Sequence, residues 1–177
     1  MLVLAWCVVA LASPLIVGRW PAALFLNRWR LGWLIWVVLI AQVLVLKLDL
    51  PHGIAAVLHV GTYAVAVAFL WFNRRFPGVY FVGAGALLNG VIIALNGGTL
   101  PASADAVARA GLIDSGHFQN SAVLENPVLP WLGDFFAWPA PLPLANTFSI
   151  GDVLIVIGAF VAAWSGARKF GDSGPAS

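Results

Sequence analysis

The sequence predicts an all-α bundle of about five membrane-spanning helices with a long, partly ordered outer loop. Three observations lead to this fold class. Of the 177 residues, 62% are hydrophobic and only 9% are charged, whereas soluble domains average about 45–50% apolar and about 25% charged residues. The apolar residues are concentrated in five long runs, each near the length that crosses a bilayer. The basic residues lie on alternate connections between these runs.

The five predicted spans follow one another along the chain, and one long segment separates the last two. They are residues 2–17, 31–46, 53–72, 79–95 and 148–167, with 96–147 as the outer loop. The first span measures about 24 Å at 1.5 Å per residue, and Pro14 is expected to kink or end it. Because no basic residue precedes this run, we expect an uncleaved helix rather than a signal peptide. All 177 residues are therefore expected to form one membrane domain.

The distribution of charge predicts the orientation of these spans. Seven of the nine basic residues lie on alternate connections that must share one side: Arg19, Arg28, Arg30, Arg74, Arg75, Arg168 and Lys169. The opposite side holds Lys47, Arg109 and most of the acidic residues, namely Asp49, Asp105, Asp114, Glu125, Asp134 and Asp152. Lysine and arginine are retained on the cytoplasmic side of a membrane. We therefore expect the amino terminus outside and the carboxyl terminus inside.

Composition also argues against several classes of function. The formal net charge is only +2 and the basic residues form no run, so nucleic-acid binding has no support. The single cysteine, Cys7, excludes an intrachain disulfide. His52, His59 and His117 fall on a predicted turn, a helix and a loop, so no metal site is expected. No nucleophile or paired-carboxylate pattern indicates an enzyme.

The second, third and fourth spans are predicted to be antiparallel neighbours, because only residues 47–52 and 73–78 connect them. The fourth span has small residues on one helical face, at Gly83, Ala86, Gly90 and Ala94. Small residues let the backbones of membrane helices approach closely. This face is therefore interpreted as a packing stripe.

The outer loop contains signs of local structure. A short helix is predicted to begin after Ser103, which would cap it, and to end at Gly111. Further along, the apolar residues around Trp131, Phe135 and Trp138 are typical of a membrane interface. We expect this loop to fold back over the outer helix ends as a lid or a docking surface for a partner. Ser149 and Asp152 then form a start for the fifth span that is similar to a capping box.

Polar residues of three spans are predicted to lie at one depth. Gln42, His59 and Asn89 each lie roughly 6–9 Å below the outer boundary at 1.5 Å per residue, and Asn96 and Asp152 lie just above them. One interpretation is a polar cluster under the outer loop that holds a ligand. The other is that these side chains hydrogen-bond neighbouring helices and have a structural role only.

Several motifs together resemble a known family. Asn96-Gly97-Gly98, followed by Pro101 and Ser103, and later 148–152, Phe-Ser-Ile-Gly-Asp, occur in the order found in small bacterial integral membrane proteins catalogued only as a domain of unknown function. The family often has methionine before the proline, where this chain has Leu100. The resemblance spans nearly the whole chain and implies a multi-pass protein of the bacterial cytoplasmic membrane. It implies no activity, substrate or site.

The function that the sequence favours is noncatalytic. We expect an accessory or scaffold protein in the lipid bilayer that packs against other membrane subunits or against copies of itself. The alternative is a binding module for a quinone or another lipid-soluble ligand, held by the polar cluster and by the loop aromatics. No cofactor is otherwise expected. A transporter is less favoured, because five helices give no two-fold repeat.

Overall fold

The computed structural model describes residues 2–48, 50–112 and 121–171. Three residues used in the sequence analysis, Asp49, Asp114 and His117, lie outside the described residues. Most of the described chain is helical. The helical elements are α1 (Leu2–Ala12), the 3-10 helix η1 (Ser13–Val17), α2 (Ala22–Leu26), α3 (Trp33–Lys47), α4 (His52–Phe72), α5 (Val79–Leu95), α6 (Ala104–Ala110), the 3-10 helix η2 (Pro130–Leu132) and α7 (Ile150–Trp164).

Each predicted apolar run corresponds to one of the long helices, although α3 and α4 each extend one residue beyond the predicted bounds, to Lys47 and His52. The fourth run and α5 have the same bounds, and the fifth run begins and ends two or three residues beyond α7. In the first run the α-helix stops at Ala12, and Pro14 lies in the 3-10 helix η1 that follows. Proline lacks the amide hydrogen that would continue an α-helix, so this change of geometry has a direct physical cause.

The expectation of an all-α protein is incomplete, because short strands join distant parts of the chain. Strand β1 (Arg19–Trp20) pairs antiparallel with β6 (Arg168–Lys169), and β4 (Phe136–Trp138) pairs antiparallel with β5 (Asn146–Phe148). A parallel pair joins β2 (Leu100–Pro101) to β3 (Ser121–Ala122). Strands of two or three residues leave no alternating pattern for a sequence to reveal.

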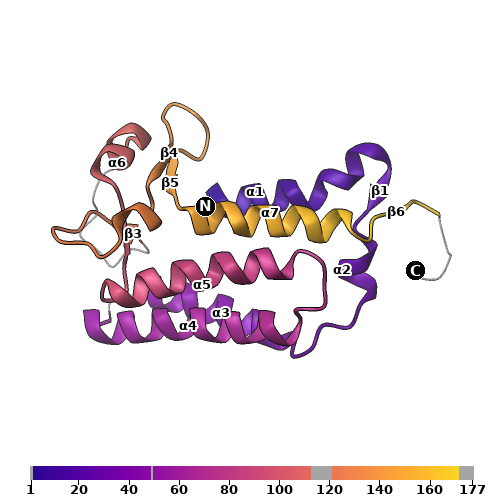
Figure 1. Ribbon diagram of the computed structural model, residues 1–177, viewed down its shortest axis with the longest axis horizontal. Helices are drawn as coiled ribbons and strands as arrows, with labels where there is room; N and C mark the ends of the chain where they lie inside the picture. The colour runs from indigo at the N-terminus through magenta and orange to yellow at the C-terminus, as the bar shows by residue number, and fades with distance from the viewer. Residues whose placement is uncertain (1, 49, 113–120, 172–177) are drawn as a thin grey trace.

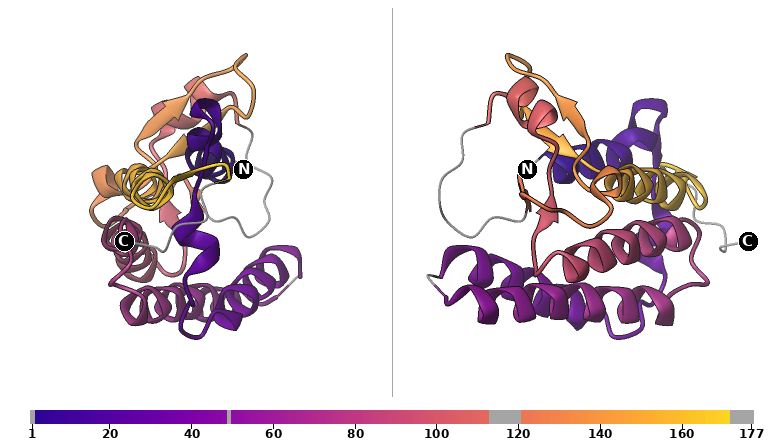
Figure 2. Two further views of the ribbon diagram at one scale, coloured as in Figure 1. Left: turned by 90° about the vertical axis from the view of Figure 1, so that its right-hand side faces the viewer. Right: turned by 60° about the vertical axis from the view of Figure 1, so that its left-hand side comes forward.

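The long helices pack in an order that differs from their order in the chain. Helix α1 packs on α7, α7 on α5, α5 on α4, and α4 on α3. Figure 1 shows the helices lying along one common direction, with α1 and α7 above α5, α4 and α3. The view along the helices in Figure 2 shows the same two groups end-on. The first and last helices of the chain are therefore neighbours.

Four glycines let α5 and α7 approach closely. A Cβ atom on Gly85 would overlap the carbonyl oxygen of Gly151, and one on Gly158 would lie 2.7 Å from the carbonyl oxygen of Gly78. Gly78 and Gly85 are seven residues apart at α5, and Gly151 and Gly158 are seven apart on α7, so the two glycines of each helix lie on one face. This interface was not predicted from the sequence. The predicted packing stripe instead faces α4, where a Cβ on Gly90 would lie 3.0 Å from the Cβ of Tyr63.

The bundle has two chemically different ends. The strand pair β1–β6 brings Arg19 beside Lys169, and the backbone of Arg30 both donates to and accepts from the Asn73 side chain, at 2.8 and 2.9 Å. The seven basic residues that were predicted to share a side thus lie at this end, called the basic end below. Residues 96–112 and 121–148 lie at the opposite end, called the loop end (Figure 1).

One helix among the described residues, α4, has both the length and the apolar composition of a membrane span. The other four long helices are apolar but shorter, at 10–17 residues.

Candidate functional site

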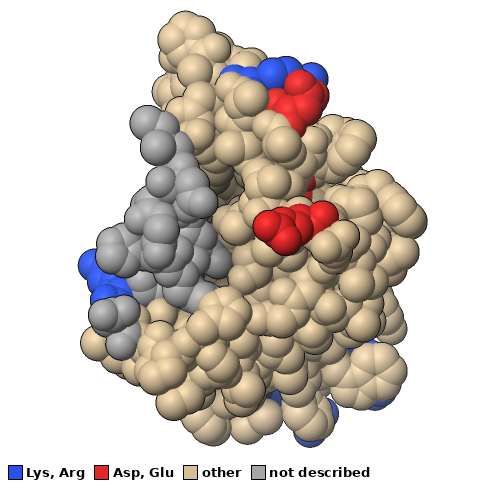
Figure 3. Space-filling view, turned by 90° about the vertical axis from the view of Figure 1, so that its left-hand side faces the viewer, with Lys and Arg blue, Asp and Glu red and all other residues tan. Residues whose placement is uncertain are grey.

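The loop end is built by the local signals that the sequence predicted. Helix α6 begins after Ser103, whose hydroxyl accepts a hydrogen bond from the Ala106 amide, and it ends at Gly111 in the left-handed conformation. The prediction of this helix and its two caps is confirmed. Nearby, an exposed ion pair joins Asp105 and Arg109 at 2.8 Å; such surface pairs contribute little stability. Figure 3 shows that most of this face is uncharged, with small acidic and basic areas.

A closed ring of hydrogen bonds joins Asn89, Ser149 and Asp152 where α5 meets the start of α7. The Asn89 amide donates to Asp152 Oδ1 at 2.9 Å, and the Ser149 hydroxyl donates to Asn89 Oδ1 at 2.9 Å. The Asp152 amide donates to Ser149 Oγ at 3.0 Å, and the Ser149 amide donates to Asp152 Oδ2 at 2.9 Å. Ser149 and Asp152 are therefore a true capping box, as predicted.

This ring depends on a glycine beside it. A Cβ atom on Gly151 would overlap the carboxamide of Asn89. Asn89 and Ser149 are both buried, so each needs the partners that the ring provides. Two of the five predicted site residues, Asn89 and Asp152, are thus in direct contact. Ser149 was identified in the sequence only as a helix cap, and its bond to Asn89 joins residues 60 positions apart.

Gln42 reaches the turn of α4 that carries His59. The Gln42 amide donates to the Thr62 hydroxyl at 3.1 Å, and that hydroxyl donates to the His59 carbonyl oxygen at 2.6 Å. The His59 side chain is fully buried and its ring meets Tyr63 edge-on, with 5.4 Å between centroids. These contacts hold α3 against α4, which is the structural interpretation of polar residues in apolar helices.

Asn96 binds the outer loop. Its amide donates to the carbonyl oxygens of Ile92 and Val128, at 2.8 and 3.0 Å, and its Oδ1 accepts from the Val128 amide at 2.7 Å. The side chain thus ends α5 and ties residue 128 to it. Whether the five predicted residues hold a ligand together stays a prediction.

Asp134 is a buried carboxylate of the loop end that the sequence did not single out as a site residue. It is 6% exposed, and the Thr147 hydroxyl donates to its Oδ2 at 3.0 Å. Its backbone bonds to Pro101 and Ser103 hold the segment before β4 against β2. Burial, assisted by the charge of Asp152, raises the pKa of Asp134 to about 6, although hydrogen bonds from Ser121 and Thr147 oppose the shift.

The raised pKa of Asp134 predicts a pH-dependent loop end. Between about pH 4 and pH 6 the folded state holds a proton on Asp134 that the unfolded state has released, so stability falls as the pH rises through this interval. The shift from 3.8 to about 6 corresponds to about 3 kcal/mol at most. We expect Asp134→Asn to remove this slope in thermal unfolding measured from pH 4 to pH 7. An unchanged slope in the variant would contradict the assignment.

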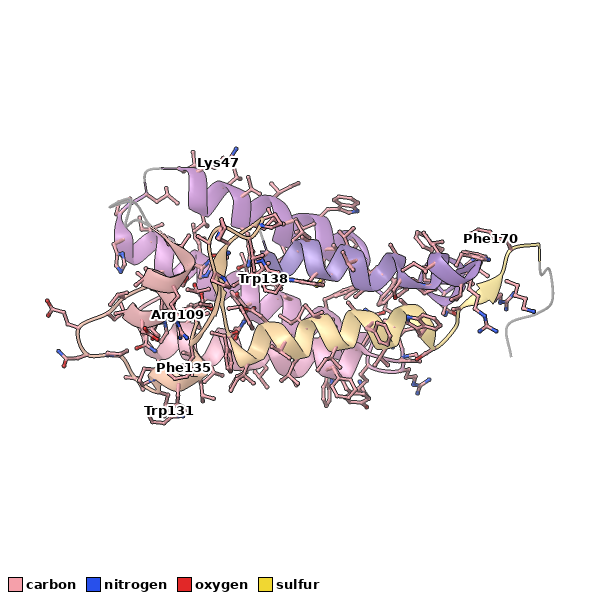
Figure 4. All side chains as sticks on the ribbon, turned by 90° about the horizontal axis from the view of Figure 1, so that it is seen from above. Lys47, Arg109, Trp131, Phe135, Trp138 and Phe170 are labelled. Carbon is pink, nitrogen blue, oxygen red and sulfur yellow. The ribbon has the colours of Figure 1, made fainter. Side chains whose placement is uncertain are left out.

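A cavity of about 240 Å³ lies beside the ring of hydrogen bonds, between the start of α1, the first turns of α7 and the β4–β5 pair. Six of its lining residues define its chemistry: Leu2, Trp6, Trp138, Phe148, Asp152 and Ile157. Asp152 is the one charged residue among the described residues of this lining. Figure 4 shows Trp138 over the bundle and Trp131 and Phe135 at the edge of the loop end, so the three loop aromatics do not share this site.

The predicted quinone site stays a prediction. Its predicted donors Gln42, His59 and Asn89 are not among the described residues that line this cavity, and of the three loop aromatics only Trp138 is. In the parts of the chain that the structure describes, no three histidine, cysteine or acidic side chains are grouped to hold a metal ion.

Comparison with known proteins gives a family but no activity. A protein of Thermotoga maritima named only as uncharacterized is 34% identical over 96 residues. These residues make up 52% of this chain and 54% of that relative, so the chain matches about half of the relative's length. No solved structure matches the chain. The model of a family of unknown function, DUF5317, matches residues 28–164, which include the helices α3 to α7 and the whole loop end. The chain therefore belongs to the DUF5317 family of unknown function.

Proposed function

We propose that this protein is a noncatalytic, multi-pass membrane protein that packs against an apolar helix of another membrane subunit. In this proposal α1, α3, α4, α5 and α7 cross the bacterial cytoplasmic membrane. The amino terminus and the loop end face outward, and the basic end faces the cytoplasm. The segments outside the helices then meet water or lipid head groups.

The exposed surface of the helices supports a lipid environment. Large apolar side chains are exposed on every long helix. One example from each helix is Val8, Trp36, Val57, Leu87 and Phe160, which are 48–72% exposed. Exposing so large an apolar surface to water costs free energy, whereas contact with lipid tails does not. The basic end supports the orientation, because arginine and lysine collect on the cytoplasmic side.

The shorter helices fit a bilayer if their ends lie in the head-group layers. Helix α5 spans about 26 Å and α7 about 22 Å at 1.5 Å per residue, against a hydrocarbon core of about 30 Å. Aromatic rings mark the basic end, where Trp29 packs on Phe76 with 4.5 Å between centroids and the Arg74 guanidinium lies 4.5 Å from the Trp71 ring. Tryptophan and arginine at such positions anchor short spans at the interface.

One observation carries the proposed packing role: an open apolar groove between α4 and α5. Its volume is about 570 Å³, and it runs along α4 from Val60 to Phe72, about 18 Å at 1.5 Å per residue. Small residues line much of it: Ala64, Ala68, Ala86, Gly90 and Ala94. An elongated groove with a small-residue floor suits a helix, because close backbone approach drives helix association in lipid.

The orientation is tested by labelling single cysteines in a Cys7→Ala background. Arg75→Cys at the basic end and Glu125→Cys at the loop end both replace exposed residues. With a membrane-impermeant maleimide and intact cells, we expect Glu125→Cys to react and Arg75→Cys to react only after permeabilisation. The reverse pattern would overturn the orientation. Reaction of both variants in intact cells would overturn the membrane-spanning arrangement.

The groove is tested by filling it. Ala68→Trp places a large ring in the groove, while Val43→Trp adds the same ring to an exposed site of α3 outside it. After mild extraction and native mass spectrometry, we expect a complex with another membrane protein from the parent and from Val43→Trp, and a free protein from Ala68→Trp. If Ala68→Trp forms the same complex as the parent, the groove is not the binding site for the partner. If the parent forms only a complex with copies of itself, the groove binds a second copy of this chain instead of another protein.

A further inference from the structure

The cavity at the start of α7 combines three features that together select one class of ligand. Its lining combines the Asp152 carboxylate with apolar side chains, among them two indole rings and a phenyl ring. Its volume of about 240 Å³ is below the roughly 300–1,000 Å³ of sites for drug-sized molecules. The space therefore suits a small head group rather than a whole large ligand.

The negative charge of Asp152 is not balanced by a basic side chain. Its two oxygens accept hydrogen bonds from neutral donors, the Asn89 amide and the Ser149 backbone. The start of α7 supplies roughly half a positive charge. Among the residues that the structure describes, the one ion pair is Arg109–Asp105, which does not include Asp152. A cation entering the cavity would therefore meet a fixed carboxylate whose charge no basic side chain neutralises.

The aromatic lining supplies the second feature. The rings of Trp6 and Trp138 meet edge-on with 5.5 Å between centroids, and Phe148 is stacked on Phe136 at 5.4 Å. The Trp138 indole also donates to the Pro143 carbonyl oxygen at 3.1 Å, which fixes its ring. Aromatic faces attract ammonium groups, tryptophan most strongly, and cages of such rings bind quaternary ammonium groups.

The third feature is an apolar path that leads away from the carboxylate. Val153, Val156 and Ile157 continue the lining along α7 toward the middle of the bundle. An alkyl chain attached to the cationic head would lie on this path and lose contact with water. A hydrated metal ion would gain nothing there, and an anion would be repelled by Asp152.

We propose that the cavity between α1, α7 and the β4–β5 pair binds an alkylammonium cation, with its head between Trp6, Trp138 and the Asp152 carboxylate and its chain along α7. The head belongs either to a membrane lipid with a quaternary ammonium group or to a free amphiphilic cation. The binding needs no covalent step. It is independent of the groove between α4 and α5, which lies on a different helix pair.

The test uses the full chain in phosphatidylglycerol nanodiscs and isothermal titration calorimetry. The probes are choline, its uncharged isostere 3,3-dimethylbutan-1-ol, and hexyltrimethylammonium. We expect choline to bind at least tenfold tighter than the isostere, and hexyltrimethylammonium to bind at least tenfold tighter than choline. Equal binding of choline and its isostere would overturn the proposal.

Two variants locate the site. Trp6→Leu keeps the lining apolar and is expected to weaken hexyltrimethylammonium binding at least fivefold, and Asp152→Asn at least tenfold. Trp33→Leu, an exposed tryptophan of α3, is the matched control and should bind as the parent does. Asp152→Asn also disturbs the capping box. If Asp152→Asn fails to fold, Trp6→Leu alone tests the site. Parent-like binding by Trp6→Leu would overturn the site.

A change of lipid distinguishes the two sources of the head group. In phosphatidylcholine nanodiscs the lipid itself presents a trimethylammonium head. Weaker probe binding there than in phosphatidylglycerol would identify the natural occupant as a lipid head group. Equal binding in both lipids would identify a free amphiphilic cation, and absence of binding in both would overturn the proposal.

Discussion

Replacing Asn89 with aspartate is expected to destabilise the protein by about 3 kcal/mol or more at neutral pH. In the native protein the Asn89 amide donates to Asp152 Oδ1 across 2.9 Å. Aspartate has nearly the same shape but offers no donor, so two carboxylates would face each other across that distance. Asn89 is 2% exposed, and like charges at such a buried position repel strongly.

The same variant should recover on acidification, because one proton shared between the carboxylates would restore a donor to the ring. Thermal unfolding of Asn89→Asp in detergent, followed from pH 7 to pH 4, is therefore expected to approach the parent at the lower pH. Asn27→Asp makes the same chemical change at an exposed position after α2, where it removes one hydrogen bond to the Ala23 carbonyl oxygen, and it should lower the stability far less than Asn89→Asp. If Asn89→Asp and the parent unfold alike at pH 7, the ring does not support the α5–α7 contact.

Adding one methyl group at Gly85 is expected to cost about 1–3 kcal/mol. Its Cβ would overlap the backbone carbonyl oxygen of Gly151, and backbone atoms of two packed helices cannot move aside as a side chain would. The helices α5 and α7 must separate to accept the methyl group, which also strains the bond between Asn89 and Asp152. Equilibrium unfolding of Gly85→Ala in mild detergent measures the effect.

The control for Gly85→Ala is the same substitution on α4. A Cβ on Gly61 would meet no atom within 4 Å, so Gly61→Ala adds helix propensity without a clash. Alanine is favoured over glycine in a helix interior by about 1 kcal/mol. We expect Gly61→Ala to be as stable as the parent or slightly more stable. Equal stability of Gly85→Ala and Gly61→Ala would contradict the close contact between α5 and α7 at Gly85.

The five long helices and α6 were predictable because each depends on residues close in sequence, whereas the five-residue helix α2 was not predicted. A long apolar run defines α5, Ser103 and Gly111 define α6, and the reciprocal bonds of Ser149 and Asp152 define the start of α7. These signals act within a few residues, where helix capping and apolar periodicity operate. All of them are present in the structure.

The short connections correctly predicted that α4 packs on both α3 and α5, whereas the contacts of α7 with α1 and α5 were not predictable, because they join residues far apart in the chain. The stripe containing Gly90 was correctly identified as a packing face, but the sequence did not show that it faces α4 rather than α7. The glycines of α5 and α7 carry a usable signal, an equal spacing of seven residues on both helices. No pattern in the sequence indicates the cavity, because Trp6, Trp138 and Asp152 come from three separate segments that only the fold brings together.

The pairing of β1 with β6, and of α1 with α7, has a consequence for biogenesis. During synthesis α1 leaves the ribosome before α7, on which it has its main packing surface. In the proposed membrane arrangement α1 therefore stays without this neighbour until residues beyond 150 emerge. A chain truncated before α7 thus leaves both α1 and α5 without their principal neighbour, and it presents quality-control proteases with an unfinished assembly.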